Sequence, residues 1–315
     1  MKDEKMTLNF QPSSLNMEFK IAQFSTLNPH LSTRNLKMAH WELIFFWITM
    51  VIYALSAGGY IYSIVFKNPQ AMSKLTAFIG LGFITHTIAI GVRYSATGHL
   101  PWSGDYESAL MGGWFIIGAT LYVGWSNRSL QGLAMATVPL VMLMMGFGYM
   151  RNPMLTPMAA SLKTFWLYIH VYFAWLAFGA YALGMSAGVL YVLKHRDASR
   201  PVKNPAYERF PSLERLDELI FRYVVFGFIT DTIMIVAGAI WAKDLWGSYW
   251  SWDPVETWSL ISWLIYGIAI HLRITFGWRD QRMAWVVIAA LSTVIISFFG
   301  VTFVVSSSLH TFNVR

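Results

Sequence analysis

The amino-acid sequence predicts an all-α fold, a polytopic helical bundle that crosses a membrane about eight times. Of the 315 residues, 56% are hydrophobic and only 12% are charged, which excludes an ordinary soluble domain. Apolar stretches that reach the roughly 20 residues needed to span a bilayer recur along the chain. They lie at about 41–66, 75–93, 107–125, 129–149, 163–193, 218–241, 257–276 and 284–305.

The segment ahead of the first span differs in character from the rest. Residues 1–40 are polar and of mixed charge, so we expect a tail there and a transmembrane domain over 41–315. The tail has no short apolar core followed by a small-residue cleavage site, and no cleaved signal peptide is expected. With the tail omitted, one set of connections holds eleven Lys and Arg and the other five. The positive-inside rule places the richer set in the cytoplasm and both termini outside.

The charge and the cysteine content limit the partners. The net charge is +7, and much of it lies in one predicted cytoplasmic loop, where it can meet anionic membrane lipid. No nucleic-acid partner is expected. Because the chain has no cysteine, it cannot form a disulfide, relay thiol reducing equivalents or hold an iron–sulfur cluster. Any thiol chemistry must belong to a partner or a substrate.

The predicted outer loop over 242–257 is rich in aromatic residues, and residues 246–258 read WGSYWSWDPVETW. Its tryptophans are Trp246, Trp250, Trp252 and Trp258. Such rigid faces, placed together, can form a platform for a flat apolar ligand. The alternative is an interfacial aromatic belt, although these four lie too close in sequence to surround a whole protein. Asp253, with Pro254 next and Glu256 three residues on, predicts a helix N-cap with a capping box.

Two histidines are expected on the same side of the membrane as this loop. His170 lies near the outer end of the fifth span, and His310 follows the eighth span. Helix parity puts both positions and the Trp loop on one side. Two imidazoles beside an aromatic platform match the bis-imidazole ligation of a haem iron. A lone surface histidine, by contrast, is more often no ligand at all.

Ionisable residues also occur within the predicted spans, where they are expensive and usually functional. His271 lies well down the seventh span and His86 midway along the second. The alternative for each is a neutral imidazole hydrogen-bonded to a neighbouring helix. Arg93, two turns beyond His86 on the same face, either neutralises a carboxylate such as a haem propionate or extends to the lipid headgroups. Asp231, near the middle of the sixth span, needs a partner that the sequence does not name.

Two stretches of sequence resemble a known family. WGSYWSWDPVETWSL with the following His271-Leu272-Arg273, and HTIAIGVRYSATGHLPWSGDYES, are similar to the CcsA/ResC family of cytochrome c biogenesis, haem-handling proteins with a tryptophan-rich WWD signature. The resemblance extends from about residue 80 to the C-terminus. It implies that His170 and His310 are axial ligands of a haem b held against the Trp platform. It also implies that His271 binds haem within the membrane, with the second ligand supplied by a ResB/CcsB-type partner subunit, so that His86, the other candidate, need not fill that role.

The resemblance further implies an activity and a location. With its partner, the chain would be a cytochrome c synthase, or haem lyase, that exports haem and joins its vinyl groups to the Cys-x-x-Cys-His thiols of apocytochrome c. A thiol reductant system would keep those thiols reduced. The location implied is the bacterial cytoplasmic (inner) membrane, or the thylakoid membrane of a plastid, with the Trp loop on the outer side.

Two other functions are open. The first is a haem carrier that loads a periplasmic haem chaperone without catalysing attachment. The second is a two-haem quinol-oxidising subunit, which would need two stable histidine pairs across the bilayer.

This sequence departs from the family pattern at two places. Val255 stands where the family commonly has a lysine, so one positive charge near the propionates is missing. The C-terminal stretch GVTFVVSSSLHTF lacks the family's asparagine after Gly-Val and the glycine before Leu-His. The second departure falls on the segment that carries His310.

Overall fold

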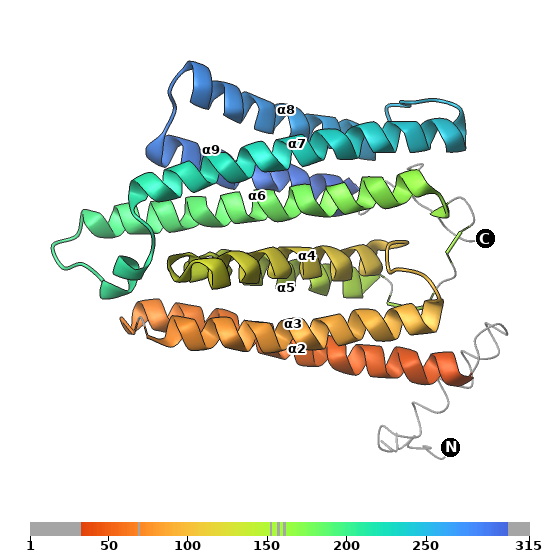
Figure 1. Cartoon of the computed structure of the whole chain (residues 1–315), viewed down its shortest axis with the longest axis horizontal. Coiled ribbons are helices and arrows are strands. Elements are labelled where there is room, and N and C mark those ends of the chain that lie inside the picture. The colour runs from red at the N-terminus through yellow and green to blue at the C-terminus, as the bar shows by residue number, and fades with distance from the viewer. Residues whose placement is uncertain (1–32, 69, 152, 156–157, 160–161, 302–315) are drawn as a thin grey trace, which may run out of the picture.

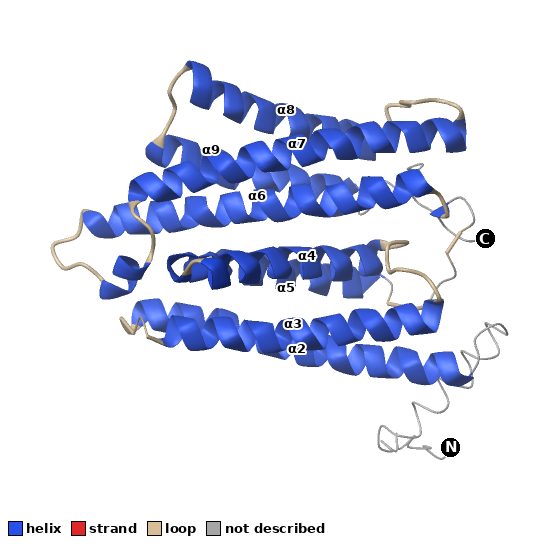
Figure 2. Ribbon diagram, in the orientation of Figure 1, coloured by secondary structure: helices blue, strands red, loops and turns tan. Residues whose placement is uncertain are grey.

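The computed structural model describes residues 33–68, 70–151, 153–155, 158–159 and 162–301. Within these residues the chain forms helices joined by loops, with no strand (Figure 2). The α-helices are α2 (Thr33–Val65), α3 (Ala71–Thr97), α4 (Asp105–Ser126), α5 (Ala134–Arg151), α6 (Phe165–Ala198), α7 (Leu213–Trp246), α8 (Pro254–Thr275) and α9 (Asp280–Ile295). The shorter elements are η1 (Arg128–Leu133), η3 (Pro205–Arg209) and the π-helix η4 (Ile296–Gly300).

The predicted membrane spans are confirmed. Eight helical segments of the described chain are long and apolar enough to cross a membrane, and each overlaps one predicted stretch. Among the boundaries that differ from the prediction, two change the description of the tail and of the Trp loop. Helix α2 begins at Thr33, so the last part of the expected tail is helical. Helix α7 continues to Trp246 and ends at Gly247, whose φ of 76° is a left-handed conformation that glycine adopts without steric penalty. The Trp loop is therefore residues 247–253.

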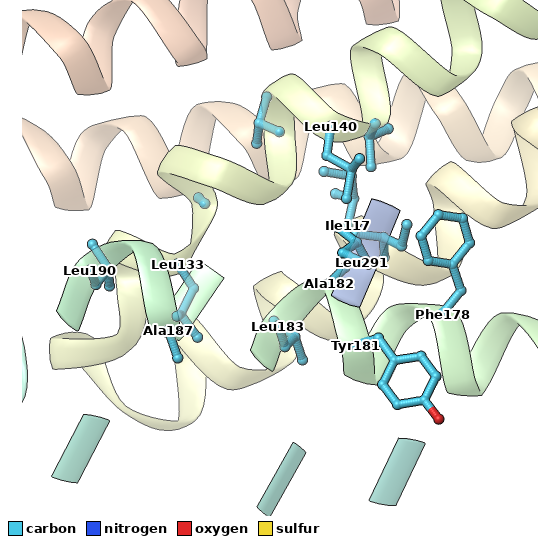
Figure 3. Close-up of a cluster of buried hydrophobic side chains, with 14 of the residues drawn as sticks. Ile117, Leu133, Leu140, Phe178, Tyr181, Ala182, Leu183, Ala187, Leu190 and Leu291 are labelled. Carbon is cyan, nitrogen blue, oxygen red and sulfur yellow. The ribbon is translucent and has the colours of Figure 1, made fainter. Parts of the chain in front are cut away.

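Helix α6 is the centre of the bundle. It lies between the α4–α5 pair and the α7–α9 pair, with α2 and α3 on one flank and α8 on the other (Figure 1). Of its most apolar stretch, 83% is buried within the protein, against 22% for α8. Apolar side chains on α8, α2 and α3 are instead exposed, as expected for helices whose solvent is lipid. Side chains of α6 such as Phe178, Leu183 and Leu190 form the middle of the hydrophobic core (Figure 3).

One end of the bundle gathers the segments that the sequence analysis singled out. The α7–α8 loop, the α3–α4 connection and the first turns of α6 all lie there (Figure 1). We call it the Trp-loop end. Helix parity predicted this grouping, because an even number of spans lies between any two of these points in the sequence. His310 lies outside the described residues.

Candidate functional site

A cavity of ≈ 200 Å³ opens at the Trp-loop end between α6, α7, α8 and η4. We call it the Trp-loop cavity. Its lining is mostly aromatic and aliphatic, with a few polar groups, as is typical of sites for small organic molecules. The lining residues are Ser108, His170, Val171, Ala174, Trp175, Met234, Ile235, Gly238, Ala239, Trp241, Ala242, Tyr249, Trp250, Val255, Glu256, Ser259, Ser297 and Phe298.

His170 stands in the second turn of α6 and contributes its imidazole to this lining. Its Nδ1 atom lies 2.9 Å from the carbonyl oxygen of Met234 on α7. Because a carbonyl can only accept, Nδ1 carries the hydrogen, and in the neutral tautomer with that hydrogen the ring lone pair is on Nε2. Histidines that bind metals in proteins are oriented in this way, with one ring N–H donated to a backbone carbonyl or a carboxylate.

The close approach of α6 and α7 at His170 depends on a glycine. A Cβ atom at Gly238 would lie 2.7 Å from His170 Nδ1 and 2.9 Å from its Cε1. Trp241 lies next to the same imidazole, with ring centroids 6.1 Å apart and planes inclined by 34°. The Met234 carbonyl and the Trp241 indole therefore position the imidazole of His170, and Gly238 leaves the space that the ring occupies.

The structure brings only some of the predicted tryptophans to the cavity. Trp250 lines it, and Trp246 packs on Trp241 with ring centroids 5.9 Å apart. Trp252 is 69% exposed and meets Trp250 edge-on at 5.9 Å. Trp258, in the first turn of α8, is half-buried and outside the lining. The aromatic wall of the cavity is completed instead by residues that the sequence analysis did not select: Trp175, Trp241 and Tyr249.

The predicted capping box at the start of α8 is confirmed. Asp253 accepts the N–H of Val255 at 2.9 Å, and Glu256 accepts the N–H of Asp253 at 3.2 Å. The Glu256 carboxylate also accepts the N–H of Ser251 at 2.8 Å, and it lines the cavity. Between these residues Trp252 has a φ of 59°, an outlier for a bulky side chain. Glu256 therefore closes the Trp loop as well as capping the helix.

We expect Asp253→Ala to lower the free energy of unfolding by about 1 kcal/mol, because the first turn of α8 loses its side-chain acceptor. Asp253→Asn keeps an acceptor oxygen and should stay near the parent. The midpoint of thermal unfolding in detergent, followed by tryptophan fluorescence, compares the two variants. Equal midpoints for the alanine and asparagine variants would contradict the capping role.

His86 and Arg93 share a face of α3, as predicted, but both lie away from the cavity lining. His86 is fully buried; its Nε2 lies 2.9 Å from the carbonyl oxygen of Leu110 and its Nδ1 3.3 Å from the Tyr53 hydroxyl. Both ring nitrogens thus link α3 to neighbouring helices. These contacts match the alternative to a functional role that the sequence analysis gave for His86, an imidazole hydrogen-bonded to a neighbouring helix.

Arg93 points into the bundle, so extension to the headgroups, one of the two alternatives for this residue, does not describe it. Its side chain is 1% exposed and pairs with Glu42 at 3.2 Å and Glu107 at 2.9 Å, both buried as well. It also donates to the carbonyl oxygens of Pro153 at 2.8 Å and Met154 at 2.9 Å. Arg93 thereby ties α2, α3 and α4 to the segment that follows α5.

His271 lies four residues before the end of α8, at the opposite end of the bundle from the Trp-loop cavity. Its ring is exposed on the outside of the bundle, with Nδ1 3.2 Å from the hydroxyl of Thr275 on the same helix. Nearby, Arg273 pairs with Asp217 at 2.6 Å and fixes this end of α8 against α7. The structure therefore separates His271 from His170 by nearly the length of α8.

The fold and the cavity define a class of protein: a multi-pass helical membrane protein with an aromatic cavity and one oriented imidazole at one end of the bundle. The family described as Cytochrome C assembly protein matches residues 102–309. The chain belongs to this family.

Individual relatives agree with this assignment. The cytochrome c biogenesis protein CcsA of Guillardia theta is 32% identical over 290 residues, which cover 84% of this chain and 94% of the relative. The CcsA protein of Porphyra purpurea is 30% identical, with 79% and 90% covered. That of Prochlorococcus marinus is 29% identical, with 86% and 92% covered.

A solved structure shares the fold. The cytochrome c heme lyase CcmF aligns with a TM-score of 0.65 and 17% sequence identity, over 83% of this chain and 46% of that chain. The bundle described above is thus an arrangement that a longer protein also contains.

Proposed function

We propose that this chain binds haem in the Trp-loop cavity through His170 and presents it for covalent attachment to apocytochrome c. The observation that carries the proposal is the imidazole itself. Its Nδ1–H is donated to the Met234 carbonyl, the orientation in which metal-binding histidines are held in proteins, with Nε2 as the ligating nitrogen. Membership of the cytochrome c assembly family supports haem as the ligand and cytochrome c maturation as the process.

The size and lining of the cavity fit partial enclosure of the macrocycle. At ≈ 200 Å³ it is smaller than the roughly 300–1,000 Å³ of sites that enclose a drug-sized ligand. Haem is larger than such ligands, so part of it would remain outside the lining. An exposed vinyl edge is what the thiols of a protein substrate need to reach.

The chain's own residues would then supply position and orientation. His170 would hold the iron, and Trp250 and Trp241 would fix the ring plane. Attachment adds each thiol S–H across a vinyl double bond: a sulfur–carbon bond forms, and the thiol hydrogen passes to the other vinyl carbon. The addition itself needs no external oxidant or reductant.

The remaining assignments rest on the family resemblance. We propose His310 as the second axial ligand at the Trp-loop end, which faces the outer side of a bacterial cytoplasmic or thylakoid membrane. We propose that His271, exposed at the far end of α8, binds a membrane-embedded haem together with a ResB/CcsB-type subunit. Exposure of this imidazole on the outside of the bundle leaves it accessible to such a partner.

The visible absorption spectrum of the purified chain, with and without dithionite, tests the proposal. We expect sharp reduced-state haem bands in the parent, their loss in His170→Ala, and their return when imidazole is added to that variant. His99→Ala is the control, because His99 is half-buried in the α3–α4 turn and does not line the cavity. Retention of both haem and activity by His170→Ala without imidazole would overturn the assignment.

A second measurement separates the synthase from the haem carrier. Co-expression with the partner subunit and an apocytochrome c should yield thioether-linked haem, detected by in-gel peroxidase staining after denaturation. Transfer of haem to a periplasmic chaperone with no covalent product would identify the chain as a carrier.

A further inference from the structure

A second, smaller cavity of ≈ 20 Å³ lies against the inner wall of the Trp-loop cavity. We call it the lower chamber. It is deeper in the bundle, because Asp231 in its lining lies about four turns before the end of α7. The two cavities share Ala174, Met234, Ser259, Ser297 and Phe298. The hydroxyls of Ser259 and Ser297 are the polar groups in the shared wall.

Asp231 is 5% exposed and has a neutral hydrogen-bond donor. The hydroxyl of Tyr181 on α6 donates to Asp231 Oδ2 at 3.1 Å. In Figure 3 the Tyr181 hydroxyl points away from the labelled core residues around it. Within the described ranges the ion pairs do not include Asp231. A carboxylate in the membrane interior without a cation is costly, so this arrangement favours the neutral acid.

Asp217, on the same helix, is the contrasting case. It is also buried, but Arg273 pairs with it at 2.6 Å, and the N–H of Asp280 donates to the same oxygen at 2.9 Å. A charged partner and a backbone donor stabilise the ionised form. Asp217 therefore has the cationic partner that the described ion pairs do not give to Asp231.

Two buried hydroxyls on α8 have no partner among the described residues: those of Ser262 and Tyr266. Ser262 is 4% exposed and lines the chamber, and Tyr266 stacks on Tyr181 at 3.5 Å. Buried polar groups of this kind are usually satisfied by an internal water molecule. One water needs roughly 10–15 Å³ and two to four polar partners. The chamber, at ≈ 20 Å³, provides the space, and Asp231, Ser262 and Ser297 provide the partners.

We propose that the lower chamber is a water- and proton-binding site: Asp231 is held there as a neutral acid, and its proton exchanges with the Trp-loop cavity through a bound water and the hydroxyls of Ser259 and Ser297. The other titratable groups along this route are Tyr181 in the lining of the chamber, with Tyr266 stacked on its ring, and His170 and Glu256 in the Trp-loop cavity. The site thus provides an exchangeable proton inside the membrane, next to the cavity of His170.

Infrared difference spectroscopy of the full chain in detergent at neutral pH tests this site without using haem, so its outcome is independent of the haem-binding proposal. We expect a carbonyl stretching band of a protonated carboxylic acid that is lost in Asp231→Asn and retained in Asp217→Asn. Tyr181→Phe should keep the band and raise its frequency, because the acid loses one hydrogen bond. If neither Asp231→Asn nor Tyr181→Phe changes the acid band, Asp231 is ionised and the proposal fails.

Exchange into deuterium oxide tests the connection to the Trp-loop cavity. The Asp231 band should shift in the parent chain, and rapid mixing with deuterium oxide gives the rate of that shift. Removing both shared hydroxyls, Ser259→Ala with Ser297→Ala, should slow that shift about tenfold, since the loss of one ordinary hydrogen bond changes a rate by about this factor. A band that resists exchange in the parent, or an unchanged rate in the double variant, would refute the route.

Discussion

Gly238→Ala will remove most of the haem from the Trp-loop cavity. The new methyl carbon would lie 2.7 Å from His170 Nδ1, closer than such atoms approach in proteins. We expect the imidazole to be displaced from its hydrogen bond to the Met234 carbonyl. Loss of the group that orients a metal-binding histidine lowers metal affinity by about 10–100-fold. Haem titration of the purified variant, followed by absorbance, measures the change directly.

A second glycine provides the control. Gly146 lies in α5, and a Cβ atom there would meet nothing within 4 Å. Gly146→Ala should bind haem like the parent. Alanine favours a helix over glycine by about 1 kcal/mol, so weaker haem binding in Gly238→Ala would not reflect weaker helix formation. Parent-like affinity in Gly238→Ala would show that His170 is not the ligand or is not held as described.

Arg93→Met will destabilise the bundle more than any surface substitution. Glu42 and Glu107 would be left as buried carboxylates without their cation, and breaking a buried pair in this way costs about 3–5 kcal/mol. We expect little folded protein in membranes and a large fall in the midpoint of thermal unfolding. Size-exclusion chromatography after a heating series, with fluorescence detection, gives both quantities.

Removing the acids together with the arginine should restore most of the loss. Arg93→Met combined with Glu42→Gln and Glu107→Gln leaves no buried charge in this network, although the carbonyls of Pro153 and Met154 lose a donor. Arg151→Ala is the matched control, because the Arg151–Asp105 pair is 36% and 29% exposed and such pairs contribute about 0–1 kcal/mol. A triple variant no more stable than Arg93→Met would contradict this account of the network.

The spans could be predicted because a segment that crosses a bilayer must satisfy its own backbone hydrogen bonds in a helix of sufficient length. The same constraint fixed the parity of the helix ends, which placed His170 and the Trp loop together. The cap at Asp253 is local in sequence and was predicted for that reason.

The lining of the cavity could not be predicted in the same way. Helices α6 and α7 are apolar around most of their circumference, so periodicity does not identify the face that carries Gly238 or Trp241. The partners of Arg93 lie 14 and 51 residues away in sequence, a pairing that only the packing of α2, α3 and α4 decides. Trp252 was chosen because of its neighbours in sequence, whereas its left-handed backbone leaves the side chain largely exposed.

The contact between His170 and position 238 also has an evolutionary consequence. A glycine there is required only while an imidazole occupies the facing position on α6. A lineage that lost the histidine would be released from that requirement, and larger residues, which form helices more readily, would accumulate at 238. Covariation of these two positions among homologous chains would therefore mark the lineages that still use the imidazole as a ligand.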